Sequence, residues 1–222
     1  MYNLLSDRRM HWQLWGAAFA LAAFVTALAA QGIFVPGDVT LARTIQSAHD
    51  VEVLQPLSEA LYRFGLSPVW PIATLSVAGL VSLRGQYLGA VFIVLAAVTR
   101  PLGVVIKEIV ERPRPSEDYV TYVEGANGFS YPSGHVFGTV LLVGFIAYVL
   151  IERETNAARR WLIAATAGAV MFLMGLQRVY AGAHWPTDAA AGWLWGGLTL
   201  FILIQLYRTL RRRTATATLV ST

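Results

Sequence analysis

The sequence predicts an all-α, polytopic membrane protein: a six-transmembrane-helix bundle with a short amphipathic extracytoplasmic helix. Of its 222 residues, 56% are hydrophobic and only 14% are charged, whereas roughly 25% of the residues in a soluble domain are charged. The mean hydropathy is positive. The hydrophobic residues gather in six runs, and each run with its interfacial flanks reaches the ~20 residues that a helix needs to cross a bilayer.

These six runs occupy most of the chain. Five of them contain no charged residue, namely 12–37, 64–83, 136–151, 161–177 and 189–207. The sixth, 85–106, is interrupted only by Arg100. The first run includes Ala27-Leu28-Ala29, which has the small residues of a signal-peptidase site, but its length and the five later runs favour a retained helix. We therefore expect residues 1–222 to form a single transmembrane domain.

The positive charges indicate how the chain crosses the membrane. The net charge of +4 would suggest nucleic acid as a partner of a soluble protein, but cytoplasmic loops of membrane proteins carry an excess of arginine. With a cytoplasmic N-terminus and six crossings, ten arginines fall on the cytoplasmic side: Arg8, Arg9, Arg84, Arg153, Arg159, Arg160, Arg208, Arg211, Arg212 and Arg213. Both termini are therefore predicted to be cytoplasmic, and no nucleic-acid partner is expected.

The connection that follows the first span carries apolar residues at near-helical spacing. Leu54, Leu57, Leu61 and Phe64 recur there between charged residues. This pattern predicts a short amphipathic helix on the outer surface of the membrane. Its apolar face would either pack against the other helices or steer a lipid sideways into the bundle.

The third span carries a charge within its apolar run. Arg100 precedes Pro101, and Lys107 follows seven residues after Arg100, which places both cations on one helix face. An arginine inside a span costs about 2.5–3.5 kcal/mol on insertion scales, so Arg100 should face the bundle interior. It either pairs with a buried polar group for structural reasons or supports whatever Lys107 binds.

A run of prolines ends this helix. Residues before proline are pushed away from the α region, so Arg112-Pro113-Arg114-Pro115 should end the helix near Glu111. The chain should then turn so that Arg114 lies across the end of this helix. Lys107 and Arg114 can then converge on one point. The polar segment 116–131, with a turn signal at Asn127-Gly128, is predicted to be an outer loop that either covers a site or is simply solvated.

The next segment predicts an anion site at a helix start. In Tyr131-Pro132-Ser133-Gly134-His135, Ser133 is placed as an N-cap and Gly134 allows a ligand to approach the backbone closely. The free N–H groups at the start of a helix attract anions. His135 would lie in the first turn, beside the anion.

The segment 177–188 places ionisable residues between two apolar runs. Arg178, His184 and Asp188 lie there, and placing ionisable groups at membrane depth costs free energy, so such residues usually serve a function. Pro186 suits the first turn of the sixth helix. Alone, His184 and Asp188 could equally be a structural pair that closes a helix end. Gly192 and Gly196, further along, form a small-residue face for helix packing.

With this topology all of these groups meet at the outer ends of the third to sixth helices. The set comprises Lys107, Arg114, Ser133, Gly134, His135, Arg178, His184 and Asp188. Three cations and a helix N-terminus suit a phosphate group, because arginine binds its oxygens as a fork and lysine as a point charge. The same cations would repel a metal ion, so no metal site is expected.

The spacing of these residues resembles that of the type-2 phosphatidic acid phosphatase superfamily, membrane lipid phosphatases that share their active site with vanadium haloperoxidases. Three motifs match in order: Lys107 with six residues before Arg114-Pro115, then Pro132-Ser133-Gly134-His135, then Arg178 with five residues before His184 and three more before Asp188. The resemblance covers about residues 87–207. Gln177 departs from the family, which usually has serine before the arginine.

The resemblance implies a role for each site residue. His184 would attack phosphorus and form a phosphohistidine, with Asp188 holding its other ring nitrogen protonated. His135 would protonate the leaving oxygen and later activate water. The phosphate oxygens would be held by Lys107, Arg114, Arg178 and the N–H groups of Ser133 and Gly134. No metal or organic cofactor would be needed.

These roles predict a phosphatase for a lipid phosphate or diphosphate. It would lie in the plasma (inner) membrane with its active site at the extracytoplasmic face, and no obligate protein partner is inferred. The competing hypothesis is a non-enzymatic lipid-phosphate carrier or flippase that uses the same cations to bind a headgroup. The sequence does not choose among undecaprenyl diphosphate, phosphatidylglycerophosphate, phosphatidate and a lipid A phosphate, because all present the same terminal group.

Overall fold

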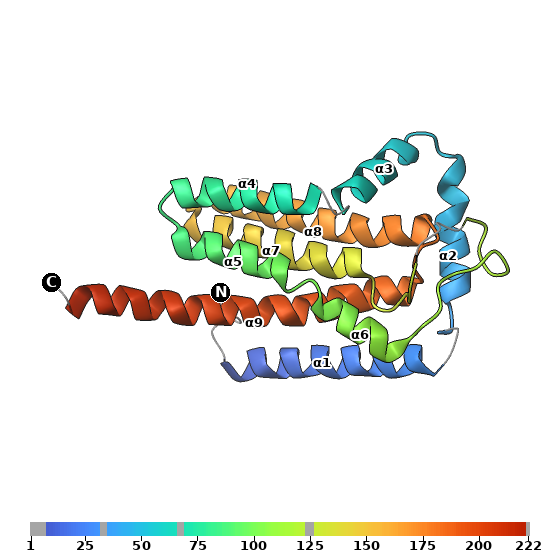
Figure 1. Cartoon of the computed structure of the whole chain (residues 1–222), viewed down its shortest axis with the longest axis horizontal. Helices are drawn as coiled ribbons and strands as arrows, with labels where there is room; N and C mark the ends of the chain where they lie inside the picture. The colour runs from blue at the N-terminus through green and yellow to red at the C-terminus, as the bar shows by residue number, and fades with distance from the viewer. Residues whose placement is uncertain (1–7, 32–34, 66–68, 123–126, 221–222) are drawn as a thin grey trace.

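The computed structural model describes residues 8–31, 35–65, 69–122 and 127–220, and within these ranges the regular structure is helical (Figure 1). The bundle consists of α1 (Arg8–Ala30), α4 (Val69–Leu83), α5 (Tyr87–Val98), α6 (Leu102–Val110), α7 (Gly134–Arg153), α8 (Ala157–Tyr180) and α9 (Pro186–Val220). The other elements, α2 (Asp38–Gln46), the 3-10 turn η1 (Ser47–Asp50) and α3 (Leu54–Phe64), cross one end of it.

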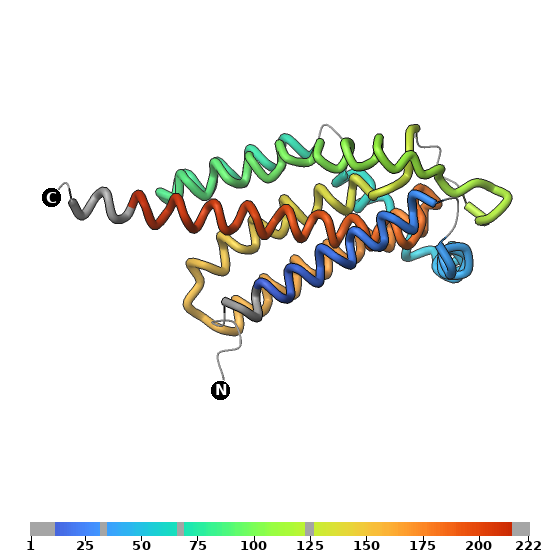
Figure 2. The backbone as a smooth tube through the Cα atoms, turned by 90° about the horizontal axis from the view of Figure 1, so that it is seen from below, coloured from blue at the N-terminus to red at the C-terminus, as the bar shows by residue number. Residues whose placement is uncertain are grey.

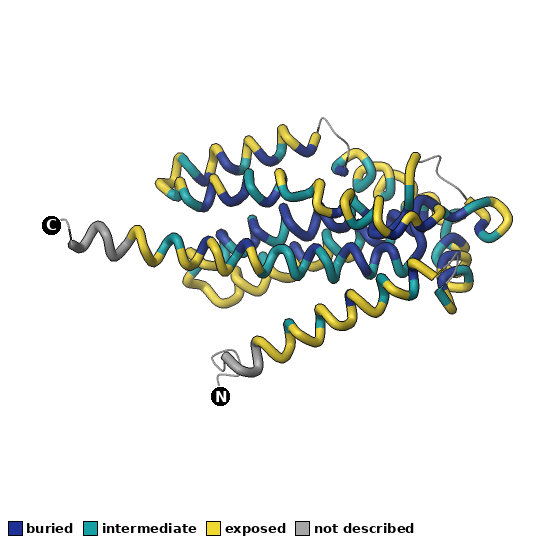
Figure 3. The backbone as a smooth tube through the Cα atoms, turned by 60° about the horizontal axis from the view of Figure 1, so that its bottom comes forward, coloured by how far each residue is buried: buried dark blue, intermediate teal, exposed yellow. Residues whose placement is uncertain are grey.

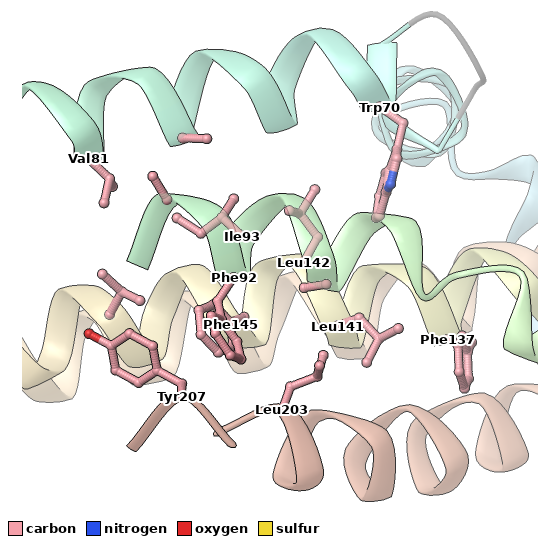
Figure 4. Close-up of a cluster of buried hydrophobic side chains, with 14 residues drawn as sticks. Trp70, Val81, Phe92, Ile93, Phe137, Leu141, Leu142, Phe145, Leu203 and Tyr207 are labelled. Atoms are coloured by element: carbon pink, nitrogen blue, oxygen red, sulfur yellow. The ribbon is translucent and has the colours of Figure 1, made fainter. Parts of the chain in front are cut away.

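The core of the bundle forms around α7. Phe145 of α7 meets Phe92 of α5 and Tyr207 of α9, with ring centroids 5.8 and 5.7 Å away (Figure 4). The predicted small-residue face of α9 packs on the same helix, because a Cβ added at Gly192 or Gly196 would lie 2.8 Å or 2.9 Å from a valine Cβ of α7. Close backbone approach of this kind replaces the hydrophobic effect as the source of helix association in a membrane.

The prediction of a helical membrane protein is confirmed, with one difference in the number of spans. Five helical stretches are long and apolar enough to cross a membrane, and a sixth is reached only if α3 and α4, which meet at 72°, count as one span. The predicted run 64–83 yields a 15-residue helix, α4, about 22 Å long at 1.5 Å per residue. The predicted amphipathic helix is α3, and α2 precedes it.

The predicted third helix is interrupted. It consists of α5 and α6, separated at Thr99, Arg100 and Pro101. Proline lacks an N–H and clashes with the carbonyl four residues earlier, so it interrupts the helical hydrogen bonds. The end of α6 agrees with the prediction, since Glu111 caps it in a left-handed conformation with φ of 52°.

The two ends of the bundle differ in what they carry. The start of α1 and the end of α9 lie at one end, together with the end of α7 and the start of α8 (Figures 1 and 2). At the other end, α2, α3 and the loop between α6 and α7 cover the bundle. Buried residues line the inner faces of the helices and lie beneath this cover, whereas the outward faces of the helices are exposed (Figure 3).

Candidate active site

The structure brings the predicted site residues to the covered end of the bundle. Four of them come from helix termini: Lys107 from the last turn of α6, His135 from the first turn of α7, Arg178 from the last turn of α8 and Asp188 from the first turn of α9. The other two lie next to helix termini, Arg114 in the loop after α6 and His184 in the turn before α9. Helix ends place side chains and free backbone groups around a shared space without interrupting a span.

His184 lies between a cation and a carboxylate. Its Nε2 is 3.3 Å from Nη1 of Arg114, and its Nδ1 is 3.6 Å from Oδ2 of Asp188. The second distance is longer than a hydrogen bond, so the expected orienting hydrogen bond is not closed in this structure. The ring is 3% exposed and Asp188 is fully buried. Asp188 Oδ2 instead accepts the Trp185 N–H at 2.8 Å.

The surroundings of His184 favour its neutral form. Burial is the main cause of a pKa well below the usual value for histidine, and the nearby charges of Lys107, Arg178 and Arg114 lower the pKa further. A neutral imidazole keeps a lone pair on one nitrogen, which a nucleophile requires.

Two of the predicted phosphate-binding cations are held by carbonyl groups. Lys107 donates to Phe129 at 2.7 Å. Arg114 donates to Ala183 at 2.7 Å and also to Gly128 at 3.0 Å and Asn127 at 3.1 Å. The predicted turn at Asn127-Gly128, where Gly128 has φ of 73°, thus brings the outer loop onto the site.

The start of α7 agrees with the prediction in part. Ser133 is the N-cap, but its N–H donates to the backbone carbonyl of Asp188 at 3.0 Å. The expectation that this N–H holds a phosphate is therefore not met here, because it joins the starts of α7 and α9. Gly134 has open space where a Cβ would be, so its backbone remains approachable.

His135 is covered by α3, a contact that the sequence did not indicate. A Cβ added at Gly65, directly after α3, would lie 2.1 Å from Cδ2 of the His135 ring. The Tyr62 ring is stacked at 6.5 Å, and Nε2 of His135 is buried without a hydrogen-bond partner among the described residues. Tyr62 also lies 5.6 Å from the guanidinium carbon of Arg178. The amphipathic helix therefore packs on two predicted site residues.

A buried ion-pair network lies behind His184. Arg112 donates to Asp188 at 2.7 Å and to Asp38 of α2 at 2.6 Å, and all three side chains are at most 1% exposed. Thr187 binds Asp38 through its N–H at 3.0 Å and its hydroxyl at 2.7 Å. From the sequence, Arg112 was interpreted only as part of the proline run that ends α6, and Asp38 was not recognised. A carboxylate next to an apolar run could have indicated a buried ion pair there.

Comparison with known proteins then places the chain in a family. Residues 86–212 match the PAP2 superfamily. The chain belongs to the PAP2 superfamily. This confirms the resemblance drawn from the three motifs.

Two relatives can be aligned with more than half of this PAP2 chain. Phosphatidylglycerophosphatase B of Bacillus subtilis is 32% identical over 136 residues, which cover 61% of this chain and 65% of that protein. The chain thus matches just under two thirds of that relative's length. Undecaprenyl-diphosphatase of Sulfolobus acidocaldarius is 28% identical over 166 residues, 72% of this chain and 74% of the relative.

Two crystal structures share the PAP2 fold of this chain. A transmembrane PAP2 type phosphatidylglycerolphosphate phosphatase from Bacillus subtilis superposes with a TM-score of 0.73 at 23% identity, over 88% of this chain and 96% of that one. LpxE of Aquifex aeolicus gives a TM-score of 0.60 at 22% identity, over 77% and 96%. The helix arrangement is therefore a known membrane fold.

Gln177, the departure from the PAP2 pattern, joins two elements of the site. Its Nε2 donates to Ser58 of α3 at 3.2 Å, and its Oε1 accepts from Arg178 at 3.4 Å. The longer side chain thus reaches α3, in addition to contacting its neighbour Arg178.

Proposed function

We propose that this protein is an integral-membrane phosphatase that hydrolyses a lipid phosphate or diphosphate through a phosphohistidine at His184, without a metal or an organic cofactor. One observation carries the proposal: the buried ring of His184 presents Nε2 beside Arg114, with Asp188 behind Nδ1. The positive charges of Lys107 and Arg178 also act on this ring, which supports a role for both as ligands of the phosphate oxygens.

In the first step the Nε2 lone pair attacks phosphorus and the bond from phosphorus to the lipid oxygen breaks. His135 gives its proton to that oxygen, which leaves as an alcohol or as a lipid monophosphate. Lys107, Arg114 and Arg178 stabilise the charge on the equatorial oxygens, where most of the catalysis of phosphoryl transfer resides. Asp188 stabilises the positive charge that develops on the His184 ring.

In the second step a water molecule hydrolyses the phosphohistidine. His135, now neutral, takes a proton from the water as its oxygen attacks phosphorus. The bond from phosphorus to nitrogen breaks, and its electron pair returns to Nε2 of His184. Phosphate then leaves, and both histidines regain their starting states.

The location follows from the distribution of arginines. Arg84, Arg153 and Arg159 lie at the bundle end that is opposite the site, and loops rich in arginine stay in the cytoplasm. We therefore place the protein in the plasma (inner) membrane, with cytoplasmic termini and an extracytoplasmic active site.

The experiment is phosphate release from lipid substrates in detergent micelles, with and without a chelator. The wild type should release phosphate with the chelator present, whereas His184→Asn should release none although its thermal midpoint shows that it is folded. A folded His184→Asn variant with full activity would refute the mechanism. A wild type that binds lipid phosphates but releases no phosphate would favour the carrier hypothesis instead.

A further inference from the structure

A cavity borders the candidate site on the side of α5 and α6. It has a volume of about 520 Å³ and lies where α5 and α6 are separated, beside the start of α7. Lys107 and Gly134 of the candidate site line part of it, and Arg100 lines another part. Val98 and Val104, also in its wall, are 65% and 51% exposed. The cavity therefore connects the proposed phosphate-binding residues to the exposed surface of α5 and α6.

Arg100 lies in this wall, and none of the described residues provides it with an anionic partner. Its side chain passes Gly138 of α7, where an added Cβ would lie 3.1 Å from Cδ of the arginine. Its guanidinium carbon is 5.2 Å from the Trp70 ring. Among the described residues, the Arg100 side chain has no hydrogen-bond or ion-pair partner. An arginine within a membrane span is costly unless it pairs with a polar or anionic group, so an unpaired one calls for an anionic ligand.

The depth of Arg100 indicates which part of a ligand it meets. Gly138 lies one turn along α7 from Gly134, which is about 6 Å at 1.5 Å per residue. The Arg100 side chain thus reaches the cavity about one helical turn deeper than the start of α7. A lipid whose terminal phosphate is bound at Lys107 and Gly134 would present its next polar group at this depth, before its tail begins.

We propose that Arg100 binds a second phosphate of the lipid, on the tail side of the phosphate that is hydrolysed. The inference rests on the proposed function and names its substrate class: lipids with two phosphates in line. The second phosphate is either the inner phosphate of a diphosphate or the phosphodiester of a phospholipid headgroup. A lipid with a single phosphate would leave Arg100 without an anion.

The Trp70 contact alone does not account for Arg100. A cation over an aromatic ring keeps its charge and its N–H donors, so the contact with Trp70 leaves those donors available to an anion. A planar guanidinium can hold two oxygens of one phosphate while its flat face remains on Trp70. The aromatic contact and the phosphate contact are therefore compatible.

The test compares substrate preference in wild type and Arg100→Gln. Phosphate release is measured in mixed micelles on three lipids: an isoprenyl diphosphate, phosphatidylglycerophosphate and phosphatidate, which has one phosphate. The readout is the ratio of kcat/KM on each two-phosphate lipid to that on phosphatidate. Both values come from one preparation, so the ratio does not depend on how much of the variant folds.

A charge-assisted hydrogen bond predicts a loss of about tenfold or more in this ratio. If the ratio falls only for the diphosphate, or only for phosphatidylglycerophosphate, that lipid supplies the second phosphate. Gly138→Ala, which displaces Arg100 without removing its charge, should lower the ratio less, and Gly168→Ala, whose Cβ meets nothing within 4 Å, should not change it.

An unchanged ratio in Arg100→Gln would overturn the inference, whether or not overall activity falls, and would leave the proposed function intact. A wild type that releases phosphate from none of the three lipids would instead refute the proposed function, and the inference with it.

Discussion

The guanidinium of Arg112 donates a 2.7 Å hydrogen bond to Asp188, and neither side chain is exposed to solvent. The same guanidinium binds Asp38 of α2. One cation therefore joins the start of α9, the loop after α6 and the helix that crosses the outer end of the bundle. Asp188 faces Arg112 with one oxygen and His184 with the other, so the position of the predicted nucleophile depends on this network.

Arg112→Ala should destabilise the protein strongly. It would leave two buried carboxylates without their shared cation, and breaking a buried ion pair in this way costs about 3–5 kcal/mol. The measurement is the thermal midpoint in detergent. Arg63→Ala is the control, because it breaks an exposed pair with Glu59 that is worth about 1 kcal/mol or less. Similar midpoints for both variants would contradict a structural role for Arg112.

Comparing Asp188→Asn with Asp38→Asn should separate the orientation of His184 by Asp188 from the contribution of the Arg112 network to protein stability. Both variants weaken the Arg112 network, but only Asp188 faces His184. We expect Asp188→Asn to lower kcat by on the order of 10² or more, as at other histidines oriented by a carboxylate. Asp38→Asn should lower the thermal midpoint with a much smaller loss of kcat. Equal losses of kcat would show that Asp188 acts only through the ion-pair network.

The sequence predicted those features that are determined by residues close together in the chain. The proline run predicted the end of α6, and the apolar spacing predicted α3. Spacing also located Lys107, Arg114, His135, Arg178, His184 and Asp188 at one end of the bundle, because helix termini in a membrane protein share a depth. The interruption at Pro101 was visible in the sequence, but the apolar run around it favoured one continuous helix.

Contacts between distant segments could not be predicted in this way. Asp38 and Arg112 are 74 residues apart in the chain, and no periodicity indicates that they meet. The packing of Gly65 on His135 depends on the angle at which α3 crosses the bundle. Arg100 was recognised as unusual from its position alone, whereas its relation to Gly138 and to the cavity required the helices to be assembled.

The pKa of His184 predicts a loss of stability in acid. Burial and three nearby cations hold this pKa below the unfolded value, which is about 6.5. Below that pH the unfolded chain takes up a proton that the folded protein does not, so the contribution of His184 to stability is present above about pH 6.5 and declines as the pH falls. Thermal midpoints of wild type and His184→Gln, measured from pH 5 to 8, should converge toward acid pH. A difference between the two midpoints that stays constant with pH would contradict the lowered pKa of His184.

Gly65→Ala should impair catalysis by displacing His135. The backbone there has φ of −78°, which alanine adopts readily, but its Cβ would lie 2.1 Å from the imidazole. A misplacement of about 1 Å can cost 10²-fold in rate, so kcat should fall by roughly 10- to 100-fold. Gly79→Ala in α4 meets nothing within 4 Å and serves as the control. If both alanine variants retain full kcat, His135 does not act from the position seen here.

Gln177 and Ser58 should act as a pair that holds α3 against α8. Their 3.2 Å hydrogen bond connects the helix that covers His135 to the helix that carries Arg178. Because neither side chain is a predicted reacting group, Gln177→Ala and Ser58→Ala should raise KM more than they lower kcat. Each loses the same hydrogen bond, worth about 0.5–1.5 kcal/mol, so the double variant should be hardly worse than either single one. Additive losses in kcat/KM would mean that the two residues act separately, and that Gln177 contributes through Arg178 alone.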